Sequence, residues 1–156
     1  MNWKEQRENA YPDIILSDCV VDKIQVNDKD IIVKFFKYGF VIREDGDSEY
    51  YHTKSAQIVI KECDINNISI QFVYRKRVMT GRIINNIKDV KPCVFMKNIS
   101  RKKWEYEIVE EYYSELGGLF IWRIREAEKS MWCYLKIQFK KIIYFWYEVD
   151  YDLRVQ

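Results

Sequence analysis

Apolar and polar side chains alternate along several stretches of this chain with a period of two residues. In 68–75 (ISIQFVYR) and 131–139 (MWCYLKIQF), every second residue is apolar or aromatic. In 104–113 (WEYEIVEEYY), apolar residues alternate with glutamates. A period of two is typical of strands that bury one face, so the pattern predicts a β-strand in each of these stretches.

Two pairs of strands are predicted to form hairpins. Residues 18–26 (DCVVDKIQV) and 31–37 (IIVKFFK) are separated by Asn-Asp-Lys-Asp, whose composition favours a turn. Residues 56–63 (AQIVIKEC) and 68–75 are separated by Asp-Ile-Asn-Asn, so we expect a second hairpin there.

Three other segments give a less regular pattern. Residues 1–11 are compatible with a short helix that Pro12 ends. The isoleucines of 82–90 fit either a short helix or a strand. Residues 142–149 (IIYFWYEV) are apolar on both faces, which predicts a central strand covered on both sides.

Composition supports a β-rich fold. The chain has 21 Ile and 13 Val, together with 5 Trp, 12 Tyr and 8 Phe, but only 5 Leu and 3 Ala. Branched and aromatic side chains suit a pleated surface, whereas helices draw on Leu and Ala. Because no repeat or Pro/Gly-rich linker divides the sequence, we expect residues 1–156 to form a single, mainly β domain. Its antiparallel sheet is expected to curl into a barrel or a sandwich and to carry one or two short helices.

Several classes of protein are excluded by the same composition. No run approaches the roughly 18 apolar residues that a membrane-spanning helix needs, and the polar start lacks the apolar core of a signal peptide. We therefore expect a cytoplasmic protein without a membrane partner. The four cysteines form no CxxC pair and His52 is the single histidine, so we expect free thiols and no metal site.

Charge is segregated along the chain. Residues 75–103 contain ten Lys or Arg and one acid, whereas 105–115 contain five Glu and no base. Two basic triplets supply the candidate binding residues: Arg75, Lys76, Arg77, Arg101, Lys102 and Lys103. These cations could be solvated and paired with the neighbouring glutamates, attract an acidic protein surface, or contact phosphates. A net charge of +2 is low for a nucleic-acid binder, so a nucleic-acid partner is the least favoured of the three.

Three aromatic residues in the C-terminal third, Trp122, Trp132 and Tyr134, are further candidates for a binding site. They could line the mouth of a barrel and stack on a small ligand. They could equally belong to the core of the sheet. If exposed, they would anchor a protein partner, because Trp and Tyr are common at interface hot spots.

Sequence features of catalysis are sparse. His52 lies close in sequence to Asp45, Asp47 and Glu49 and could act as a general base. Glutamates two residues apart on strand 104–113 would lie about 7 Å apart, a separation that inverting glycosidases use. Yet the chain contains no nucleophile-elbow GxSxG, HExxH or P-loop motif. We assign no catalytic residue and expect neither an enzyme nor a cofactor.

The N-terminal region resembles a known kind of protein. Ser17-Asp18-Cys19-Val20-Val21-Asp22-Lys23-Ile24, followed by Ile31-Ile32-Val33-Lys34-Phe35 and Gly39-Phe40, resembles the opening hairpin of small uncharacterised β-sheet proteins of low-GC bacteria. That group includes immunity-type partners of polymorphic toxins. A composition of 21 Ile, 17 Lys and 8 Asn fits a low-GC source, because these residues have AT-rich codons.

Two hypotheses for function follow. The first is a non-enzymatic protein-binding module whose partner is another protein, such as an immunity-type inhibitor of a bacterial toxin. The second is a small-ligand-binding β-barrel. A minor hydrolase and a nucleic-acid binder are less favoured alternatives. An enclosed, aromatic-lined cavity above about 300 Å³ would favour the second hypothesis. The identity of the partner and the oligomeric state stay open.

Overall fold

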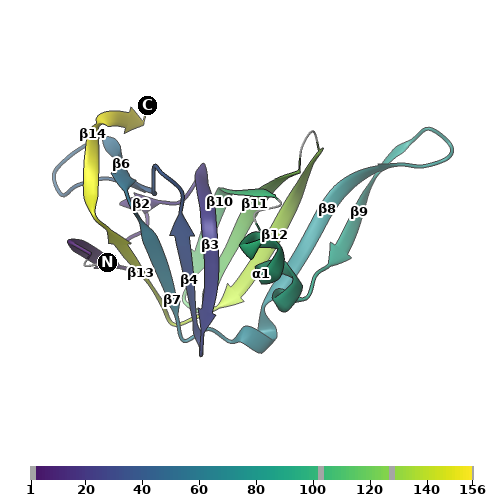
Figure 1. The fold of residues 1–156 in the computed structure, drawn as a ribbon, viewed down its shortest axis with the longest axis horizontal. Coiled ribbons are helices and arrows are strands. Elements are labelled where there is room, and N and C mark those ends of the chain that lie inside the picture. Colours follow the sequence, from purple (N-terminus) through teal and green to yellow (C-terminus); the bar gives the residue numbers. More distant parts are fainter. Residues whose placement is uncertain (1–2, 102–103, 127–128, 156) are drawn as a thin grey trace.

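The computed structural model describes residues 3–101, 104–126 and 129–155, which form two antiparallel sheets and one α-helix (Figure 1). The large sheet has ten strands in the spatial order β1 (Glu5–Glu8), β13 (Lys141–Trp146), β7 (Gln57–Lys61), β4 (Asp30–Phe35), β3 (Cys19–Asn27), β10 (Glu105–Ser114), β11 (Gly117–Glu126), β12 (Lys129–Gln138), β8 (Ser69–Arg77) and β9 (Ile83–Asp89). The small sheet has the order β14 (Glu148–Val155), β6 (Tyr50–Lys54), β5 (Val41–Ile42) and β2 (Ile14–Ile15). The prediction of a mainly β, antiparallel fold is confirmed.

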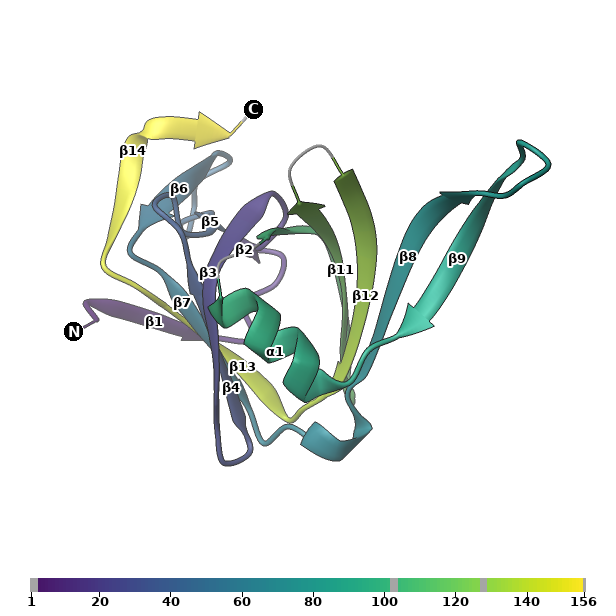
Figure 2. The same cartoon turned by 45° about the vertical axis from the view of Figure 1, so that its right-hand side comes forward.

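The large sheet bends at its middle, where β3 meets β10. The ladder between these two strands is short and joins only Cys19–Val21 to Tyr106–Ile108. Both strands also carry a register shift beside this ladder, and such bulges bend and twist a sheet. The strands on either side therefore form two walls that face one another (Figure 2). The outermost strands, β1 and β9, do not pair with each other, so the described strands form no closed barrel.

Helix α1 (Pro92–Ser100) lies across the opening between the two walls (Figure 2). It begins at Pro92, because proline fits the first turn of a helix, where its missing N–H would have no partner. Phe95 and Ile99, one turn apart, are buried against the sheet. The ring of Phe95 contacts Phe72, Tyr106 and Trp122 edge-on. The helix thus closes the core that the curled sheet leaves open.

The interior between the walls is filled by side chains. Buried residues alternate along β12 and along the first half of β8, as the sequence predicts. Along β10 the alternation fails, because a register shift between Ile108 and Glu110 leaves Glu111 buried and Tyr112 exposed. An internal space lined by both walls, with Ile31 on β4 and Leu135 on β12 among its neighbours, measures about 10 Å³. Such a space is too small for a small-molecule ligand.

Several expectations from the sequence are wrong in detail. Residues 5–8 form edge strand β1 rather than a helix, and they pair with Ile143–Trp146 of β13. Strand β13 lies next to that edge and buries only one face, so it is neither central nor covered on both sides. The segment 82–90, left open between helix and strand, contains strand β9. The helix of the fold lies instead at 92–100.

The two predicted hairpins have different outcomes. Strands β3 and β4 form the first one as expected. The second is wrong, because β7 pairs with β4 and β13 whereas β8 pairs with β12 and β9. The short 3-10 helix η1 (Ile65–Asn67) carries the chain from one wall to the other. The polar composition of 64–67 suits this crossing as well as it suits a hairpin turn.

The length of the helix and the state of the cysteines bear on two expectations from the sequence. No helix in the described part of the chain has the length and apolar character that a membrane crossing requires. The four cysteines are unpaired thiols, of which Cys93 is exposed and the other three are buried.

Candidate functional site

The β8–β9 hairpin, residues 69–89, projects from the body of the molecule, and we call it the arm (Figures 1 and 2). Its base belongs to the large sheet, because Ser69–Val73 of β8 pair with Trp132–Lys136 of β12. Beyond Val73, β8 leaves β12 and pairs with β9 alone. The outer half of the arm is therefore a two-stranded ribbon with no other described strand beside it.

An open groove of about 1020 Å³ lies where β8 and β12 separate. It is lined by Phe72, Val73, Tyr74 and Arg75 of β8, Asn85 and Lys88 of β9, and Lys129, Ser130, Met131, Trp132 and Tyr134 of β12. Two other depressions, one beside the β10–β11 turn and one between Asn9 and Tyr144, hold about 270 and 260 Å³. The groove is thus several times larger than either of them.

The arm and its groove are basic. Residues 69–89 contain Arg75, Lys76, Arg77, Arg82 and Lys88 against one acid, Asp89. The Asp89 carboxylate accepts a hydrogen bond of 3.0 Å from the side chain of Gln71. Among the described residues, no carboxylate forms an ion pair with any of the five cations. Their charge is therefore not neutralised within the described part of the chain.

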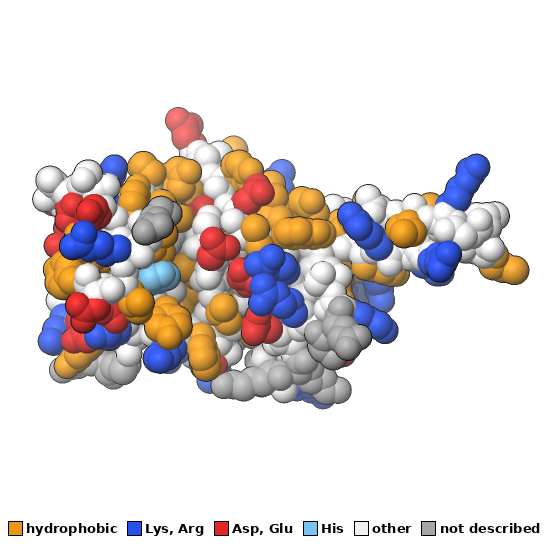
Figure 3. All heavy atoms as spheres, turned by 90° about the horizontal axis from the view of Figure 1, so that it is seen from above, with side chains coloured by type: hydrophobic (Ala, Val, Ile, Leu, Met, Phe, Trp, Pro, Cys, Tyr) orange, Lys and Arg blue, Asp and Glu red, His pale blue; other side chains and the backbone are white. Residues whose placement is uncertain are grey.

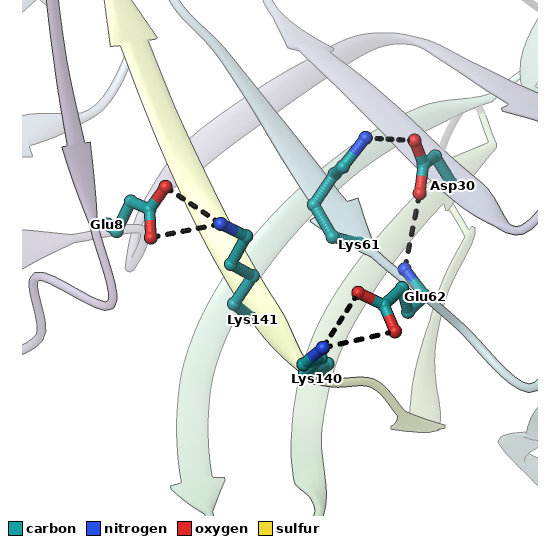
Figure 4. A network of polar contacts seen from close by, with 6 residues as sticks. All are labelled: Glu8, Asp30, Lys61, Glu62, Lys140 and Lys141. Atoms are coloured by element: carbon teal, nitrogen blue, oxygen red, sulfur yellow. Dashed lines mark hydrogen bonds and ion pairs between the residues drawn. The ribbon is translucent and has the colours of Figure 1, made fainter.

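The opposite wall shows how this chain neutralises charge elsewhere (Figure 4). There the Lys141 ammonium lies 2.9 Å from Glu8, and the Lys140 ammonium lies 3.2 Å from Glu62. Lys61 pairs with Asp30 on the neighbouring strand in the same way. These three cations of the body thus have acidic partners, whereas the five cations of the arm have none among the described residues.

Large apolar side chains are exposed on the same arm. Ile83 and Ile87 on edge strand β9 are 66% and 63% exposed, and Met79 at the tip is fully exposed. Beside them, Trp132 and Tyr134 of β12 are 42% and 38% exposed. Figure 3 shows hydrophobic and basic side chains along the projecting arm and no acidic side chain on the face in view.

The register places two of these residues, Trp132 and Ile87, in one row with Val73. Trp132 pairs with Val73, and Val73 pairs with Ile87, so the three side chains share one face of the sheet. It is the outer face, since the neighbouring residue Phe72 is buried on the inner one. The arm and the start of β12 thus combine an apolar row with cations that have no acidic partner among the described residues.

Comparison with known proteins gives no further information on the arm. No family model, curated protein or solved structure matches the chain. The role of the arm is therefore inferred from its own side chains.

The first basic triplet and the three aromatic candidates named from the sequence lie in different parts of the structure. The triplet Arg75-Lys76-Arg77 lies on the arm, and Trp132 and Tyr134 line the groove with Arg75. Trp122 lies in the core, 2% exposed, and does not reach a surface.

The second triplet is not brought together with the first by any contact of the described residues. Arg101 is exposed at the end of α1, whereas Lys102 and Lys103 lie outside the described residues. The patch that the structure defines is therefore the arm with the start of β12.

Two lysines of the groove were missed as site residues by the sequence analysis. Lys88 belongs to the basic stretch but not to a triplet, and Lys129 lies far away in sequence. Both border the groove because β8 lies between β9 and β12 in the sheet. Strand order is a long-range property, and local alternation carries no signal for it.

The glutamates of β10 have partners other than the two triplets. Glu107 is buried and binds Arg123 at 2.6 Å and Arg125 at 2.8 Å, and Glu105 lies 2.7 Å from Arg125. Among the described residues, neither of these glutamates pairs with a member of the two triplets.

Glu111 is the most unusual carboxyl group of the described chain. It is buried and accepts hydrogen bonds from the backbone N–H of Leu16 at 2.6 Å and from the Tyr113 hydroxyl at 2.5 Å. The Tyr113 hydroxyl also lies 3.1 Å from that of Tyr144. Burial raises the pKa of Glu111 to about 7, against the lowering effect of its two donors. Its Oε1 contact ties β10 to the segment before β3, which is a structural role.

The other features weighed for catalysis or metal binding stay unsupported. His52 lies on β6 with its ring 6.1 Å from that of Tyr38, and its Nδ1 has no partner. Asp47 and Glu49 bind the hydroxyl of Tyr51 instead. Within the described residues, no group of His, Cys, Asp and Glu is arranged to hold a metal ion.

Proposed function

We propose that this chain is a non-enzymatic protein-binding module, and that the arm and its groove form the interface. The observation that carries the proposal is the coincidence of exposed isoleucines with unneutralised cations on a ribbon that projects from a packed body. An edge strand with exposed apolar residues invites pairing with another chain, and proteins usually blunt or cover such edges. The curled sheet then serves as a rigid scaffold for the arm.

A protein partner fits this surface better than nucleic acid. Cations alone would suit phosphates, but Ile83, Ile87 and Met79 gain nothing from contact with a phosphate backbone. An apolar patch beside charged residues is typical of a protein interface, where the centre is apolar and the rim is polar. The partner is expected to offer acidic and apolar groups together.

The small-ligand hypothesis has less support. Its central requirement was an enclosed cavity lined by aromatic residues, and the space between the walls measures about 10 Å³. The groove is much larger but lies open to solvent on the surface. Open grooves of this kind suit a chain segment of a partner better than a small molecule, which is normally enclosed over most of its surface.

An immunity-type inhibitor of a bacterial toxin is the specific form of this function that we propose, in a cytoplasmic setting. Support comes from the resemblance of the opening hairpin and from the absence of catalytic motifs in the sequence. A toxin gene beside the gene for this chain, and neutralisation of that toxin by the purified chain, would establish this role. A neighbouring toxin that the chain fails to neutralise would contradict it.

The interface can be tested by site-specific photocrosslinking in the source cell. A benzoylphenylalanine residue at Ile87 on the arm is compared with one at Leu116, which is 74% exposed on the turn between β10 and β11. We expect one protein to be captured in near-stoichiometric yield from Ile87 and not from Leu116. Equal capture from both positions, or capture of nucleic acid from Ile87, would contradict the proposal.

A further inference from the structure

We infer that the partner presents an extended segment with alternating acidic and apolar residues, which enters the fork between β8 and β12 as an additional strand. The fork is the space between Tyr74–Arg77 of β8 and Lys129–Met131 of β12, at the open end of the groove. This inference rests on the proposed function and specifies the chemistry of the partner.

Both sides of the fork carry backbone that is paired on one side only. Tyr74–Arg77 pair with β9, and Lys129–Met131 pair with β11. The last residues that β8 and β12 join to each other are Val73 and Trp132. Beyond this point no other described strand pairs with the facing N–H and C=O groups, and unpaired backbone groups of this kind can accept another strand, which is the basis of recognition by strand addition.

The two faces of the fork differ in chemistry. Lys88 pairs with buried Phe72 and so lies on the inner face, and Lys129 shares that face because it is two residues before Met131, which packs against the core. The outer face carries the apolar row of Trp132, Val73 and Ile87. Successive residues of a strand point to opposite faces. An inserted strand with carboxylates on one face and apolar side chains on the other would therefore match both faces at once.

The cations at the fork are available for such a strand. Glu126 of β11 stands opposite Lys129 in the register, but no ion pair joins them in the described chain. On the outer face, Arg75 lies at the mouth of the fork, two residues beyond Val73. A carboxylate at the end of the inserted segment would meet this guanidinium, and bidentate pairing with arginine adds geometric specificity.

A peptide library tests the inference without knowledge of the partner. Twelve-residue displayed peptides with random acidic, apolar and polar positions are selected on the full chain. A second selection uses the charge-reversed variant Lys88→Glu/Lys129→Glu. We expect the full chain to enrich peptides in which acidic and apolar residues alternate, and the variant to enrich none of them. Enrichment of basic peptides, of clustered rather than alternating acids, or of no peptide would overturn the inference.

The selected peptide then reports on main-chain pairing and on the site. We expect N-methylation of alternate amides to weaken binding at least tenfold on one set of positions, because those N–H groups donate to the fork. Lys88→Glu/Lys129→Glu should weaken it at least tenfold. The matched control Lys23→Glu/Lys34→Glu reverses two lysines that stand opposite each other on β3 and β4, and it should change affinity less than twofold. Binding that tolerates N-methylation of either set would overturn strand insertion.

Two further probes decide the source of the negative charge. Twelve-nucleotide oligothymidine and vesicles containing phosphatidylserine are tested as competitors of the selected peptide. If either competes at lower concentration than the free peptide, the fork is a site for phosphate groups and the inference is wrong. If crosslinking from Ile87 captures a protein while no alternating acidic peptide binds, the proposed function stands and strand insertion alone fails.

Discussion

The body of the molecule and the arm are built from the same kind of alternating sequence, yet they use it in opposite ways. Strand β8 shows the change within nine residues. Its first half buries Ile70 and Phe72 between the sheet and α1, whereas its second half, Tyr74–Arg77, lies in the unsupported ribbon. Alternation thus predicts a strand, but only the layer packed against it decides whether its apolar face is core or surface.

The two regions should therefore differ in what their residues contribute. In the body, the core side chains are enclosed and contribute most of the stability. On the arm, the exposed apolar side chains and the cations without an acidic partner among the described residues contribute little to folding, which leaves their interaction energy for binding. Substitutions that change stability without changing association, or the reverse, test this difference between the body and the arm.

The largest expected contrast lies between Phe95 and Ile87. Phe95 on α1 is fully buried among aromatic rings, so Phe95→Ala should lower the free energy of unfolding by about 3–5 kcal/mol. Ile87→Ala removes an exposed side chain and should change it by less than about 0.5 kcal/mol. Urea unfolding followed by tryptophan fluorescence measures both. A loss above about 1.5 kcal/mol for Ile87→Ala would show that the arm belongs to the core.

The next effect concerns pH and is confined to the body. The folded-state pKa of Glu111 is raised from 4.5 to about 7, so the folded state binds more protons than the unfolded state between these values. Stability from this group is therefore present below about pH 4.5 and is lost as the pH rises to about 7, by at most about 3 kcal/mol. Tyr113, Tyr144 and Cys19 surround the group but stay neutral in this range, because burial raises the pKa of each.

The variant Glu111→Gln removes this titration. Its amide oxygen can still accept from the Leu16 N–H, so the fold should persist. We expect the stability difference between wild type and variant to change in favour of the variant as the pH rises from 5 to 8. Unfolding in urea at a series of pH values measures the difference. A constant difference would mean that Glu111 titrates alike in the folded and unfolded states.

Local pattern was sufficient for the elements of the body and insufficient for the site. Alternation identified strands β8, β10 and β12, and turn composition identified the β3–β4 hairpin. Local pattern did not place α1, which begins at Pro92, because the missing N–H of a proline suits the end of one element as well as the start of the next.

The site depends on long-range pairing that local signals do not contain. Trp122 and Trp132 are both tryptophans of alternating strand segments, and local sequence does not tell which one is buried. The curl of the sheet places Trp122 in the core and Trp132 in the groove. Lys129 joins Arg75 at the fork because β12 and β8 are neighbours, although the two residues are far apart in the chain. The count of charges along the chain indicated the basic region 75–103, whereas only the order of strands in the sheet shows that β12 lies beside it.

A smaller effect is expected on association. Arg75→Glu/Arg77→Glu reverses two charges on the outer face of the arm and should slow association with the protein captured through Ile87 about tenfold at low salt. The effect should fade at 0.5 M NaCl, because salt screens exposed charges. The control Lys23→Glu/Lys34→Glu carries the same change in net charge at β3 and β4. Stopped-flow mixing measures the rates, and equal slowing by both variants would assign the effect to net charge rather than to the arm.

The smallest expected effects have opposite signs in the two regions. Lys140→Ala removes an exposed ion pair with Glu62 and should lower the free energy of unfolding by less than about 0.5 kcal/mol. Arg77→Ala removes a cation that shares a face with Arg75 and has no acidic partner among the described residues, so it should raise stability by a few tenths of a kcal/mol through relief of repulsion. Both changes should shrink when urea unfolding is repeated in 0.5 M rather than 0.02 M NaCl. A loss of more than about 1 kcal/mol for Arg77→Ala would mean that the arginine stem packs within the arm, and the unpaired charge would then be a consequence of folding rather than a surface kept for a partner.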